Sequence, residues 1–372
     1  MAKLGEVCLL KAGKFVSAND ISPEYNKGLY PCFGGNGIRG YVADYTHDGE
    51  FPLIGRQGAL CGNVNLASGK FHATEHAVVV QPKIEMNVHW LYYALNAMNL
   101  GQYATGAAQP GLAVSKLETL SIEIPNISEQ NKIAQTLCKV EQLVNFRKQQ
   151  LAKLDELVKA RFVEMFGDSV ANTKNFPSTT LETVMTVFPQ NGLYKPQTDY
   201  VQDDTGIPIL RIDAFYNGKV TNWNTLKRLI CSETEIDRYL LKENDIVINR
   251  VNSIEYLGKC AHIVGLKEKT VFESNMMRFH MDEKKVNAVY VTEVLCTEDI
   301  YRQILRRAKK SVNQASINQE DVKSLEILVP PLSLQNQFAA FVERVDQQKQ
   351  TVQQSLEKLE LMKKALMQEY FG

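Results

Sequence analysis

The chain lacks several features that mark common classes of protein. Its 372 residues contain no apolar run of about 18 residues, the length that a membrane-spanning helix needs. It also has no basic-then-apolar start and no lipidation signal. We therefore expect a cytoplasmic protein with no membrane partner. A hydrophobic content of 44% with 23% charged residues is typical of a globular chain of two or three domains.

Cysteine is present but follows no metal-binding or disulfide pattern. The seven cysteines are odd in number and never spaced Cys-x-x-Cys. This pattern indicates reduced thiols that serve mostly as small buried hydrophobes. We expect no metal and no cofactor. The cysteines are Cys8, Cys32, Cys61, Cys138, Cys231, Cys260 and Cys296.

An excess of positive charge is also missing, because 42 Lys and Arg balance 42 Asp and Glu. An autonomous nucleic-acid binder is usually strongly basic. If this chain contacts DNA, either its basic residues gather locally or a partner supplies much of the phosphate neutralisation.

What the sequence does contain is a long internal repeat. Residues 109–167 return without a gap at 314–372, and 19 of the 59 positions are identical. Short periods of 20–50 residues indicate solenoids or propellers, whereas an offset of 205 residues indicates two related halves with an approximate twofold. The identical pairs include Gln109/Gln314, Pro125/Pro330, Gln130/Gln335, Asn131/Asn336, Phe166/Phe371 and Gly167/Gly372.

Each half begins with a predicted domain of mixed structure, at residues 1–126 and 168–331. Glycine and proline punctuate the short strand-like runs in both. In the first half, strands are expected at 6–10, 40–43, 51–54 and 77–80, a helix at 89–99, and a closing strand ending at Pro125. In the second, strands are expected at 207–212, 245–249, 262–264 and 325–330, and a helix at 290–307.

Each half then ends in a predicted long helix, at 127–167 and 332–372. Apolar residues follow a heptad spacing, with Ser128 as the expected N-cap and Gly167 as the stop. A helix of about 39 residues would be ~58 Å long. The expected seam residues are Ile133, Leu137, Val140, Leu151 and Leu154 in the first helix, and Phe338, Val342, Val345, Leu356 and Leu359 in the second.

The two apolar stripes are interrupted at different places. Arg147 and Arg161 break the first stripe, and Lys349 and Lys363 break the second. Where one helix is broken, the repeat-equivalent position of the other is apolar. Such complementary helices are expected to pair with each other, antiparallel, as a coiled coil. The alternative is that each helix packs only on its own domain. The predicted fold class is therefore α+β, with two mixed α/β domains joined by two long helices.

Two short motifs match enzyme signatures without their structural context. Residues 35–40 read Gly-x-Gly-x-x-Gly, but a strand rather than a helix is expected after them, which disfavours dinucleotide binding. Residues 72–76 read His-x-x-Glu-His, but the flanks read as strand, and in a strand His72 and His76 lie about 13 Å apart, too far for one zinc ion. No other catalytic signature is evident, and we expect a chain that is not an enzyme.

Arginines at two predicted strand ends are the first candidates for DNA contact. Arg56 follows Ile-Gly and precedes Gln57; Arg250 follows Ile-Asn and precedes Val-Asn252. Arg, Gln and Asn can make paired hydrogen bonds with purine edges. The alternative is an arginine paired with a local acid in a turn.

A second candidate is the run 301–310, which holds Arg302, Arg306, Arg307, Lys309 and Lys310 and no acid. It suits phosphate contact, and a solvated helix face is an equally good reading. The full set of candidate DNA contacts is Arg39, Arg56, Gln57, Lys70, Gln109, Arg211, Arg250, Asn252, Lys259, Arg306, Arg307, Lys309, Lys310 and Gln314.

Taken together, the motif order resembles the specificity subunit of a type I restriction–modification system. The segments that carry the resemblance are 30–41, 52–58, 106–109 and 124–130 in the first half, and 209–213, 313–317 and 329–335 in the second. One departure is that Pro110-Gly111 is replaced by Ala315-Ser316.

The resemblance implies two target-recognition domains that each read one half of a split double-stranded DNA sequence, with the helices setting the gap. It also implies partners: methyltransferase subunits, two in number, on the helices, and restriction/translocase subunits. Two rival classes stay open from the residues alone. One is a DNA-independent coiled-coil scaffold, which would bind no duplex even with every partner present. The other is an enzyme, with which NAD(H) or stoichiometric zinc would co-purify.

Overall fold

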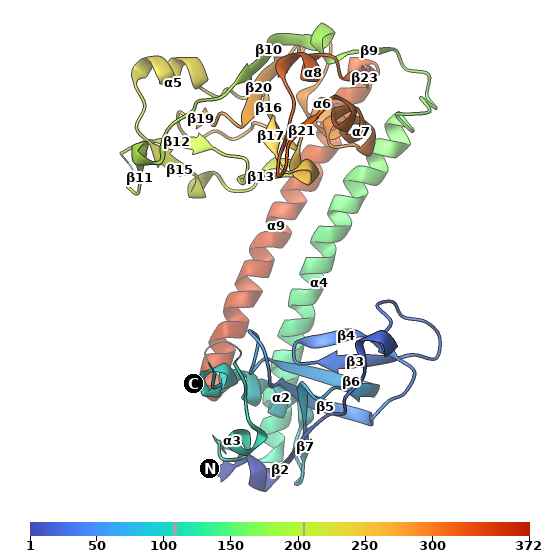
Figure 1. The fold of residues 1–372 in the computed structure, drawn as a ribbon, viewed down its shortest axis with the longest axis vertical. Coiled ribbons are helices and arrows are strands. Elements are labelled where there is room, and N and C mark those ends of the chain that lie inside the picture. Colours follow the sequence, from blue (N-terminus) through green and yellow to red (C-terminus); the bar gives the residue numbers. More distant parts are fainter. Residues whose placement is uncertain (107–109, 204) are drawn as a thin grey trace. The chain divides into compact units, whose positions relative to one another are not determined.

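The computed structural model describes residues 1–106, 110–203 and 205–372. The chain divides into two compact units, residues 1–151 with 351–372, and residues 152–350. The expected Gln109 lies outside the described residues. Each unit contains one mixed domain and part of each long helix, α4 (Ile127–Phe166) and α9 (Leu332–Phe371). Both helices begin and end within one residue of the predicted bounds (Figure 1).

The first unit is built on a six-stranded sheet in the order β2-β7-β5-β6-β3-β4. All its neighbours are antiparallel except β3 and β6, which are parallel. Helix α2 covers the sheet and shares its core with the first turns of α4 and the last turn of α9. The elements are β1 (Ala2–Lys3), α1 (Leu4–Val7), β2 (Cys8–Ala12), β3 (Tyr30–Gly34), β4 (Gly37–Val42), β5 (His47–Gly55), β6 (Val64–Ala73), β7 (Ala77–Pro82), α2 (Val88–Ala97), α3 (Val114–Glu118) and β8 (Ser121–Ile122).

The second unit has a six-stranded sheet, β10-β20-β16-β18-β14-β13, and a four-stranded sheet, β11-β15-β12-β19. A three-stranded sheet, β17-β22-β21, and the pair β23-β9 complete it. Its strands are β9 (Ser178–Thr180), β10 (Met185–Asn191), β11 (Tyr200–Val201), β12 (Ile207–Leu210), β13 (Phe215–Tyr216), β14 (Gly218–Val220), β15 (Lys227–Leu229), β16 (Asp245–Asn249), β17 (Val251–Asn252), β18 (Cys260–His262), β19 (Val271–Phe272), β20 (Met276–Met281), β21 (Lys309–Lys310), β22 (Ala315–Ser316) and β23 (Glu326–Leu328). Its shorter helices are α5 (Glu233–Tyr239), α6 (Ala288–Leu295), α7 (Glu298–Arg307) and α8 (Gln319–Lys323).

Several predicted element bounds are wrong, each for a local reason. The strand expected at 6–10 is helix α1 followed by β2, because the Glu6 carboxylate accepts the Lys3 N–H at 3.0 Å and starts a helical turn. The helix expected at 290–307 is two helices, since Thr297 N-caps α7. Helix α4 begins at Ile127, because the Asn126 side chain accepts the Glu129 N–H at 3.0 Å in place of the expected cap Ser128.

The strands expected at 207–212 and 262–264 are also shifted. The first ends at Leu210, because the backbone N–H of Ile212 turns away to donate to the Glu273 carboxylate at 2.6 Å. The second runs from Cys260 to His262, where it pairs with β16. Strand β16 has the predicted bounds.

The same set of hydrogen bonds, here called the clamp, fixes α2 to α4 in the first unit and α6 to α9 in the second. In the first unit, the Asn87 N–H donates to the Gln130 side chain at 2.9 Å, and the Asn87 amide donates to Asn131 at 2.7 Å. Gln130 in turn donates to the Pro125 carbonyl at 2.8 Å. With Gln130 only 2% exposed, the clamp lies inside the core.

In the second unit the clamp is formed by the repeat-equivalent side chains. The Asn287 N–H donates to Gln335 at 2.8 Å, the Asn287 amide donates to Asn336 at 2.9 Å, and Gln335 donates to the Pro330 carbonyl at 2.7 Å. The clamp therefore explains why the identical pairs Gln130/Gln335 and Asn131/Asn336 occur at the start of the two long helices. Sequence reasoning missed its partners Asn87 and Asn287, which lie outside the repeated segment.

Candidate nucleic-acid interface

In the first unit, a glycine turn brings polar side chains to the end of strand β5. The turn between β3 and β4 lies against β5, since a Cβ on Gly55 would sit 2.0 Å from the Gly35 carbonyl oxygen. Gly37 has a φ of +99°, a value that suits glycine. This close approach places Arg39 and Gln57, both exposed, around one pocket of about 480 Å³. The structure thus brings together two predicted contacts that lie apart in the sequence.

Arg56 follows the last residue of β5, as expected for an arginine at a strand end. Its backbone N–H donates to the His76 carbonyl at 3.0 Å, and its carbonyl accepts the Leu112 N–H at 2.9 Å. The side chain is half-buried, and its Nε, a buried atom, has no hydrogen-bond partner within the described part of the chain. The backbone is therefore fixed while the guanidinium keeps donors for another molecule.

Arg250 occupies the same position in the second unit. It follows β16, its N–H donates to the Asn275 carbonyl at 2.8 Å, and its carbonyl accepts the Ile317 N–H at 2.9 Å. Ile317 is the repeat equivalent of Leu112. The Arg250 Nη1 donates to the Ser274 carbonyl at 3.1 Å, while the Arg250 Nε is buried and unpaired among the described residues. The interpretation that Arg56 and Arg250 are copies of one position is supported by matching backbone bonds.

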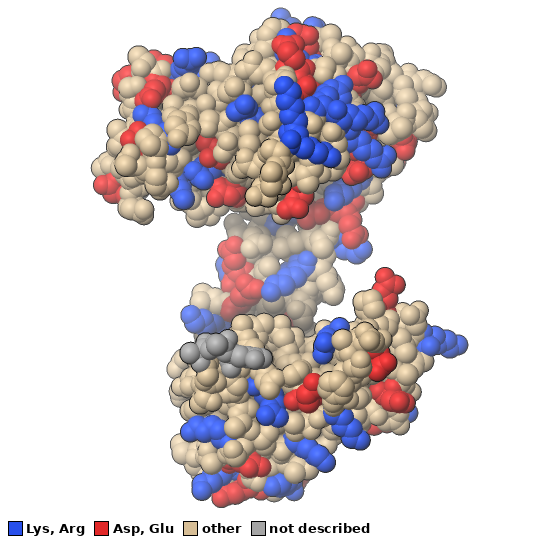
Figure 2. All heavy atoms as spheres, in the orientation of Figure 1, with Lys and Arg blue, Asp and Glu red and all other residues tan. Residues whose placement is uncertain are grey.

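The basic run ends in a hairpin beside Arg250. Strand β22 pairs with β17 on one side, Ala315 opposite Asn252, and with β21 on the other, Ala315 opposite Lys310. Lys309, Lys310 and Gln314 are exposed on this small sheet. Figure 2 shows a patch of Lys and Arg over the region where Figure 1 labels α7 and β21.

Within α7, the arginines differ in how far they are already engaged. Arg307 donates from Nε to the Ser324 hydroxyl at 3.0 Å and from its terminal nitrogens to the carbonyls of Gln303 and Ser324. Arg302 pairs with Glu298 at 3.4 Å, whereas Arg306 is exposed. The helix is anchored by Arg307, and Arg306 with the hairpin lysines is left facing solvent.

Arg211 and Lys259 are held by neighbours within the second unit. Arg211 lies 3.4 Å from the Glu273 carboxylate and 3.8 Å from that of Asp213, and it donates to the Tyr200 hydroxyl at 3.1 Å. The Lys259 ammonium lies 3.9 Å from the Tyr216 ring centroid and donates to the Ile212 carbonyl at 2.6 Å. Burial lowers the pKa of Lys259. DNA contact by these two residues stays a prediction.

Lys70 stands apart from the glycine turn. Asn65 on β6 contacts that turn, and Lys70 lies five residues farther along the same strand, about 17 Å away. Its ammonium sits 4.7 Å from the Tyr45 ring centroid, and a hydrogen bond with the Tyr45 hydroxyl raises the pKa of Lys70. The structure therefore does not bring Lys70 to the Arg39 pocket.

The long helices pair antiparallel within each unit. In the first, Glu141 of α4 bonds Lys363 of α9 at 2.7 Å, and Arg147 donates to Ser355 at 3.2 Å. In the second, Lys349 bonds Asp155, and the Arg161 guanidinium of α4 lies 5.8 Å from the ring centroid of Phe341 on α9. Along these contacts the residue numbers rise in α4 and fall in α9, as in an antiparallel pair of helices. The polar breaks of the two stripes are thus contacts to the facing helix.

The predicted seam residues do not all serve the helix pair. Ile133 and Leu137 belong to the core that α2 and the first sheet share, so the alternative of packing on the own domain holds for these first turns. Phe338 packs on Phe162 and Phe166 at ring-centroid distances of 5.5 Å. The seam residues Val140, Leu154, Val342, Val345 and Leu356 are buried, and Leu151 and Leu359 are half-buried.

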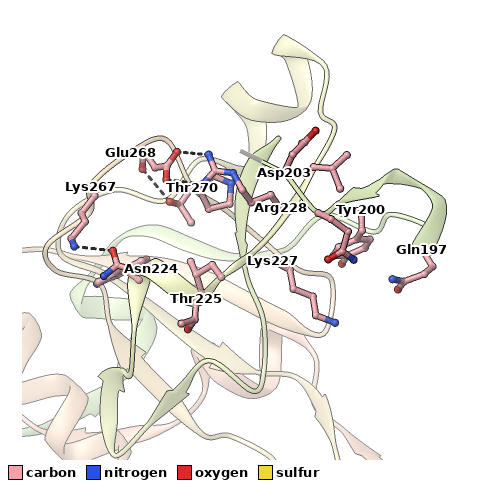
Figure 3. Close-up of a pocket in the computed structure, with 15 residues that line it drawn as sticks. Gln197, Tyr200, Asp203, Asn224, Thr225, Lys227, Arg228, Lys267, Glu268 and Thr270 are labelled. Carbon is pink, nitrogen blue, oxygen red and sulfur yellow. Dashed lines mark hydrogen bonds and ion pairs between the residues drawn. The ribbon is translucent and has the colours of Figure 1, made fainter. Parts of the chain in front are cut away.

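A polar pocket of about 490 Å³ in the second unit was not anticipated by any sequence motif (Figure 3). It lies around β11 and β15. Arg228 donates to both oxygens of Glu268 at 2.9 and 2.7 Å, and Lys267 donates to Asn224 at 2.9 Å. The Arg228–Glu268 ion pair on one side of the pocket suits a structural role.

The two enzyme-like motifs lie in strands and turns. Residues 35–40 form the β3–β4 turn and strand β4, with no helix after them. His72 lies on β6 with its Nε2 3.2 Å from the Lys14 carbonyl oxygen, while His76 pairs with Glu75. Across residues 1–106, 110–203 and 205–372, no group of three or more His, Cys, Asp or Glu side chains could hold a metal ion. None of the described helices is both long and apolar enough to cross a membrane.

Comparison with known proteins places the whole arrangement in one family. Residues 1–156 and 176–361 match the family described as the type I restriction modification DNA specificity domain. The chain belongs to this family. The resemblance inferred from the motif order is confirmed, because the matching family is one of type I DNA specificity domains.

Individual members of the type I specificity family resemble parts of the chain. The EcoprrI specificity subunit of Escherichia coli is 53% identical over 143 residues, which cover 38% of this chain and 36% of that protein. The StySPI specificity subunit of Salmonella potsdam is 25% identical over 84% of this chain and 65% of that protein. The first of these matches thus spans about a third of the relative's length.

A solved structure shares the fold over the whole chain. The S subunit of a type I restriction-modification system from M. genitalium has a TM-score of 0.68 at 16% identity, covering 100% of this chain and 95% of that one. This likeness confirms the α+β fold of mixed domains joined by long helices.

Proposed function

We propose that this chain is the DNA-recognition subunit of a type I restriction–modification complex and reads a bipartite, non-palindromic target in double-stranded DNA. The observation that carries the proposal is the pair Arg56 and Arg250. Each follows a central strand, has its backbone fixed by the same two bonds, and keeps a buried Nε unpaired among the described residues. Two units with one equivalent arginine but different neighbours suit two different blocks of sequence.

The side chains beside each arginine support different readout in the two units. Arg39 and Gln57 share the pocket beside Arg56, and both residue types can bond base edges in the major groove. Asn252, Gln314 and the two lysines of β21 lie on the small sheet that follows Arg250. Two non-identical surfaces recognise two non-identical blocks, so the target is not a palindrome.

The long helices support the second part of the proposal, the partners and the gap. Their pairing leaves Leu143, Phe146 and Leu157 of α4 exposed, between 46% and 61%. Exposed apolar side chains on a helix are suited to a protein partner. Methyltransferase subunits, two because there are two related halves, dock on the helices, and restriction/translocase subunits join the assembly. The neutral net charge is consistent with partners that neutralise the DNA phosphates.

Methylome sequencing tests the target. Cells would carry this chain and the methyltransferase encoded beside it, with a second strain carrying the methyltransferase alone. The expected result is methylation at a motif of two short specified blocks separated by unspecified base pairs, absent from the second strain. A palindromic or continuous motif would contradict bipartite recognition. A complete complex that binds no duplex would favour the DNA-independent scaffold.

A further inference from the structure

A cysteine, a histidine and a glutamate form a linear array in the first unit. The Cys138 sulfur on α4 lies 3.4 Å from Nδ1 of His89 on α2. Nε2 of the same ring lies 3.2 Å from a carboxylate oxygen of Glu50 on β5. Three elements of one core therefore position a nucleophile, a base and an acid in order.

The chemistry of the three groups sets the position of the ring proton. A carboxylate only accepts hydrogen bonds, so the neutral His89 ring carries its proton on Nε2 and donates it to Glu50. Nδ1 is then free to accept the proton of the Cys138 thiol. A nucleophile bonded to a base that a third group orients is the arrangement of covalent catalysts.

Hydrogen bonds compensate the charge of Glu141, which lies near the thiol. The Tyr93 hydroxyl, 3.6 Å from the Cys138 sulfur, donates at 2.7 Å to Glu141, which also accepts from Lys363. Although burial opposes its ionisation, the bonds from Lys363 and Tyr93 hold the pKa of Glu141 below its usual range. Tyr92 on α2 stays neutral because burial raises its pKa. Lys132 lines the same pocket and is exposed.

The array opens to solvent through a shallow pocket of about 570 Å³. Cys138 and His89 line it together with Asn87, Asn131 and Lys132. Cys138 is half-buried, unlike the fully buried Cys8 and Cys32, so a small reagent can reach its sulfur.

The second unit does not contain this array. The clamp asparagines align Asn87 with Asn287, which places Val289 opposite His89, and the 205-residue offset places Glu343 opposite Cys138. The shared fold therefore does not require a thiol and an imidazole at these places.

We propose that Cys138 is an activated thiol and a site of mixed-disulfide formation with small disulfides such as glutathione disulfide. His89 Nδ1 takes the thiol proton as the Cys138 sulfur attacks one sulfur of the reagent. The reagent's S–S bond breaks as the protein–glutathione S–S bond forms. The departing thiolate receives the proton from His89, so the reagent disulfide is the only oxidant and one glutathione thiol is released. This proposal goes beyond DNA recognition and does not depend on it.

The test measures rates on the folded full-length chain. Glutathione disulfide is added under second-order conditions, and peptide mass spectrometry follows each cysteine. Cys231 is the internal control, because it is also half-buried but lies among Glu235, Lys195 and Asp199. We expect Cys138 to react roughly tenfold or more faster than Cys231, and His89→Gln to remove that advantage.

Glu50, which acts through His89, needs a test that separates orientation from structure. Glu50→Gln keeps an acceptor for Nε2–H and should retain most of the rate, whereas Glu50→Ala should lose it, with Cys231 unchanged in both. Equal rates for Cys138 and Cys231 in the unmodified chain would overturn the proposal. So would an unchanged Cys138 rate in His89→Gln. If labelling of the buried Cys8 shows that His89→Gln unfolds, the test rests on Glu50→Ala. An unchanged Cys138 rate in Glu50→Ala then overturns the proposal.

Discussion

Arg56 and Arg250 show how one residue can be both fixed and available. The backbone of each bonds two neighbouring segments, which holds the Cα in place. The side chain then crosses the edge of the core, where an unpaired buried Nε–H costs free energy until a partner accepts it. Because Nε is buried, a DNA acceptor would meet the terminal nitrogens of the guanidinium, which can bond a purine edge.

The first prediction replaces these arginines one at a time. Arg56→Ala should weaken binding to the block read by the first unit by ~1–3 kcal/mol and relax sequence preference there, and Arg250→Ala should do the same for the other block. Competition binding of the assembled complex to targets altered in one block measures both effects. Lys83→Ala is the control, since Lys83 donates to the Gly5 carbonyl at 2.6 Å and does not line the Arg39 pocket. An Arg56→Ala complex with unchanged affinity and preference would show that the assignment for the first unit is wrong.

The basic hairpin gives a contrasting outcome in the same assay. Lys309→Ala with Lys310→Ala should weaken binding about equally on every sequence and reduce the salt dependence, because phosphate contacts release counterions and carry no base information. Measurements at two salt concentrations separate this effect from base readout. A loss confined to one sequence would mean that the hairpin reads bases.

His262 makes the second unit sensitive to acid. Burial lowers the pKa of His262 from its usual 6.5 to about 4, and its Nε2–H donates to Asn244 at 3.1 Å. Between these two values the unfolded chain binds a proton that the native chain excludes. This part of the stability is therefore complete above pH ~6.5 and is lost as pH falls toward ~4, by at most roughly 3–4 kcal/mol at ~1.4 kcal/mol per pKa unit.

Urea unfolding at pH 7 and pH 5 measures this loss. His262→Gln, which cannot titrate, should show a smaller difference between the two pH values than the unmodified chain. If His262→Gln loses as much stability on acidification as the unmodified chain, another group is responsible.

At the scale of elements, the clamp is the contact that orients each domain on its long helix. Gln130→Ala or Gln335→Ala should each lower the free energy of unfolding by roughly 1–3 kcal/mol, because the N–H of Asn87 or Asn287 loses its acceptor inside the core. Gln135→Ala, on the exposed face of the same helix, should have almost no effect. The urea midpoints of the three variants measure this difference. Equal midpoints would show that the clamp does not stabilise the fold.

The long helices were predictable from sequence, whereas the clamp was not. Heptad spacing sustained over about 39 residues leaves few alternatives to a paired helix. The glutamine and asparagine of the clamp are visible in the repeat as Gln130/Gln335 and Asn131/Asn336. Their partners Asn87 and Asn287 are offset by 200 residues rather than 205, so the alignment that reveals the repeat misses them. An N-cap asparagine before each domain helix was the only available signal.

The candidate site was predictable only in part, for a related reason. Arg56 and Arg250 could be found because each follows a predicted strand and has similar neighbouring residues. The pocket that joins Arg39 to Gln57 depends on the Gly35–Gly55 approach, which is a tertiary contact between segments some 20 residues apart. Glu273, the nearer of the two acids that engage Arg211, likewise lies on another segment, 62 positions away. Composition and spacing cannot reveal which charges a fold will pair.

At the scale of the whole molecule, the helices are proposed to set the gap between the two recognised blocks. Four residues inserted after Gln149, and four at the level of its partner Gln354, would lengthen both helices by about one turn, ~6 Å. Arg147 contacts Ser355, so the two insertions fall at matching levels of the antiparallel pair. At ~3.4 Å per base pair, the gap should grow by one to two base pairs. Both blocks should keep their sequence, because no residue of either domain has changed.

Methylome sequencing of cells carrying the lengthened subunit and its methyltransferase measures the gap directly. The control carries alanine at Gln149 and Gln354 without insertion, and should keep the original gap. An altered block sequence would place base readout in the helices. An unchanged gap in a complex that still methylates would mean that something other than the helix length spaces the two domains along the DNA.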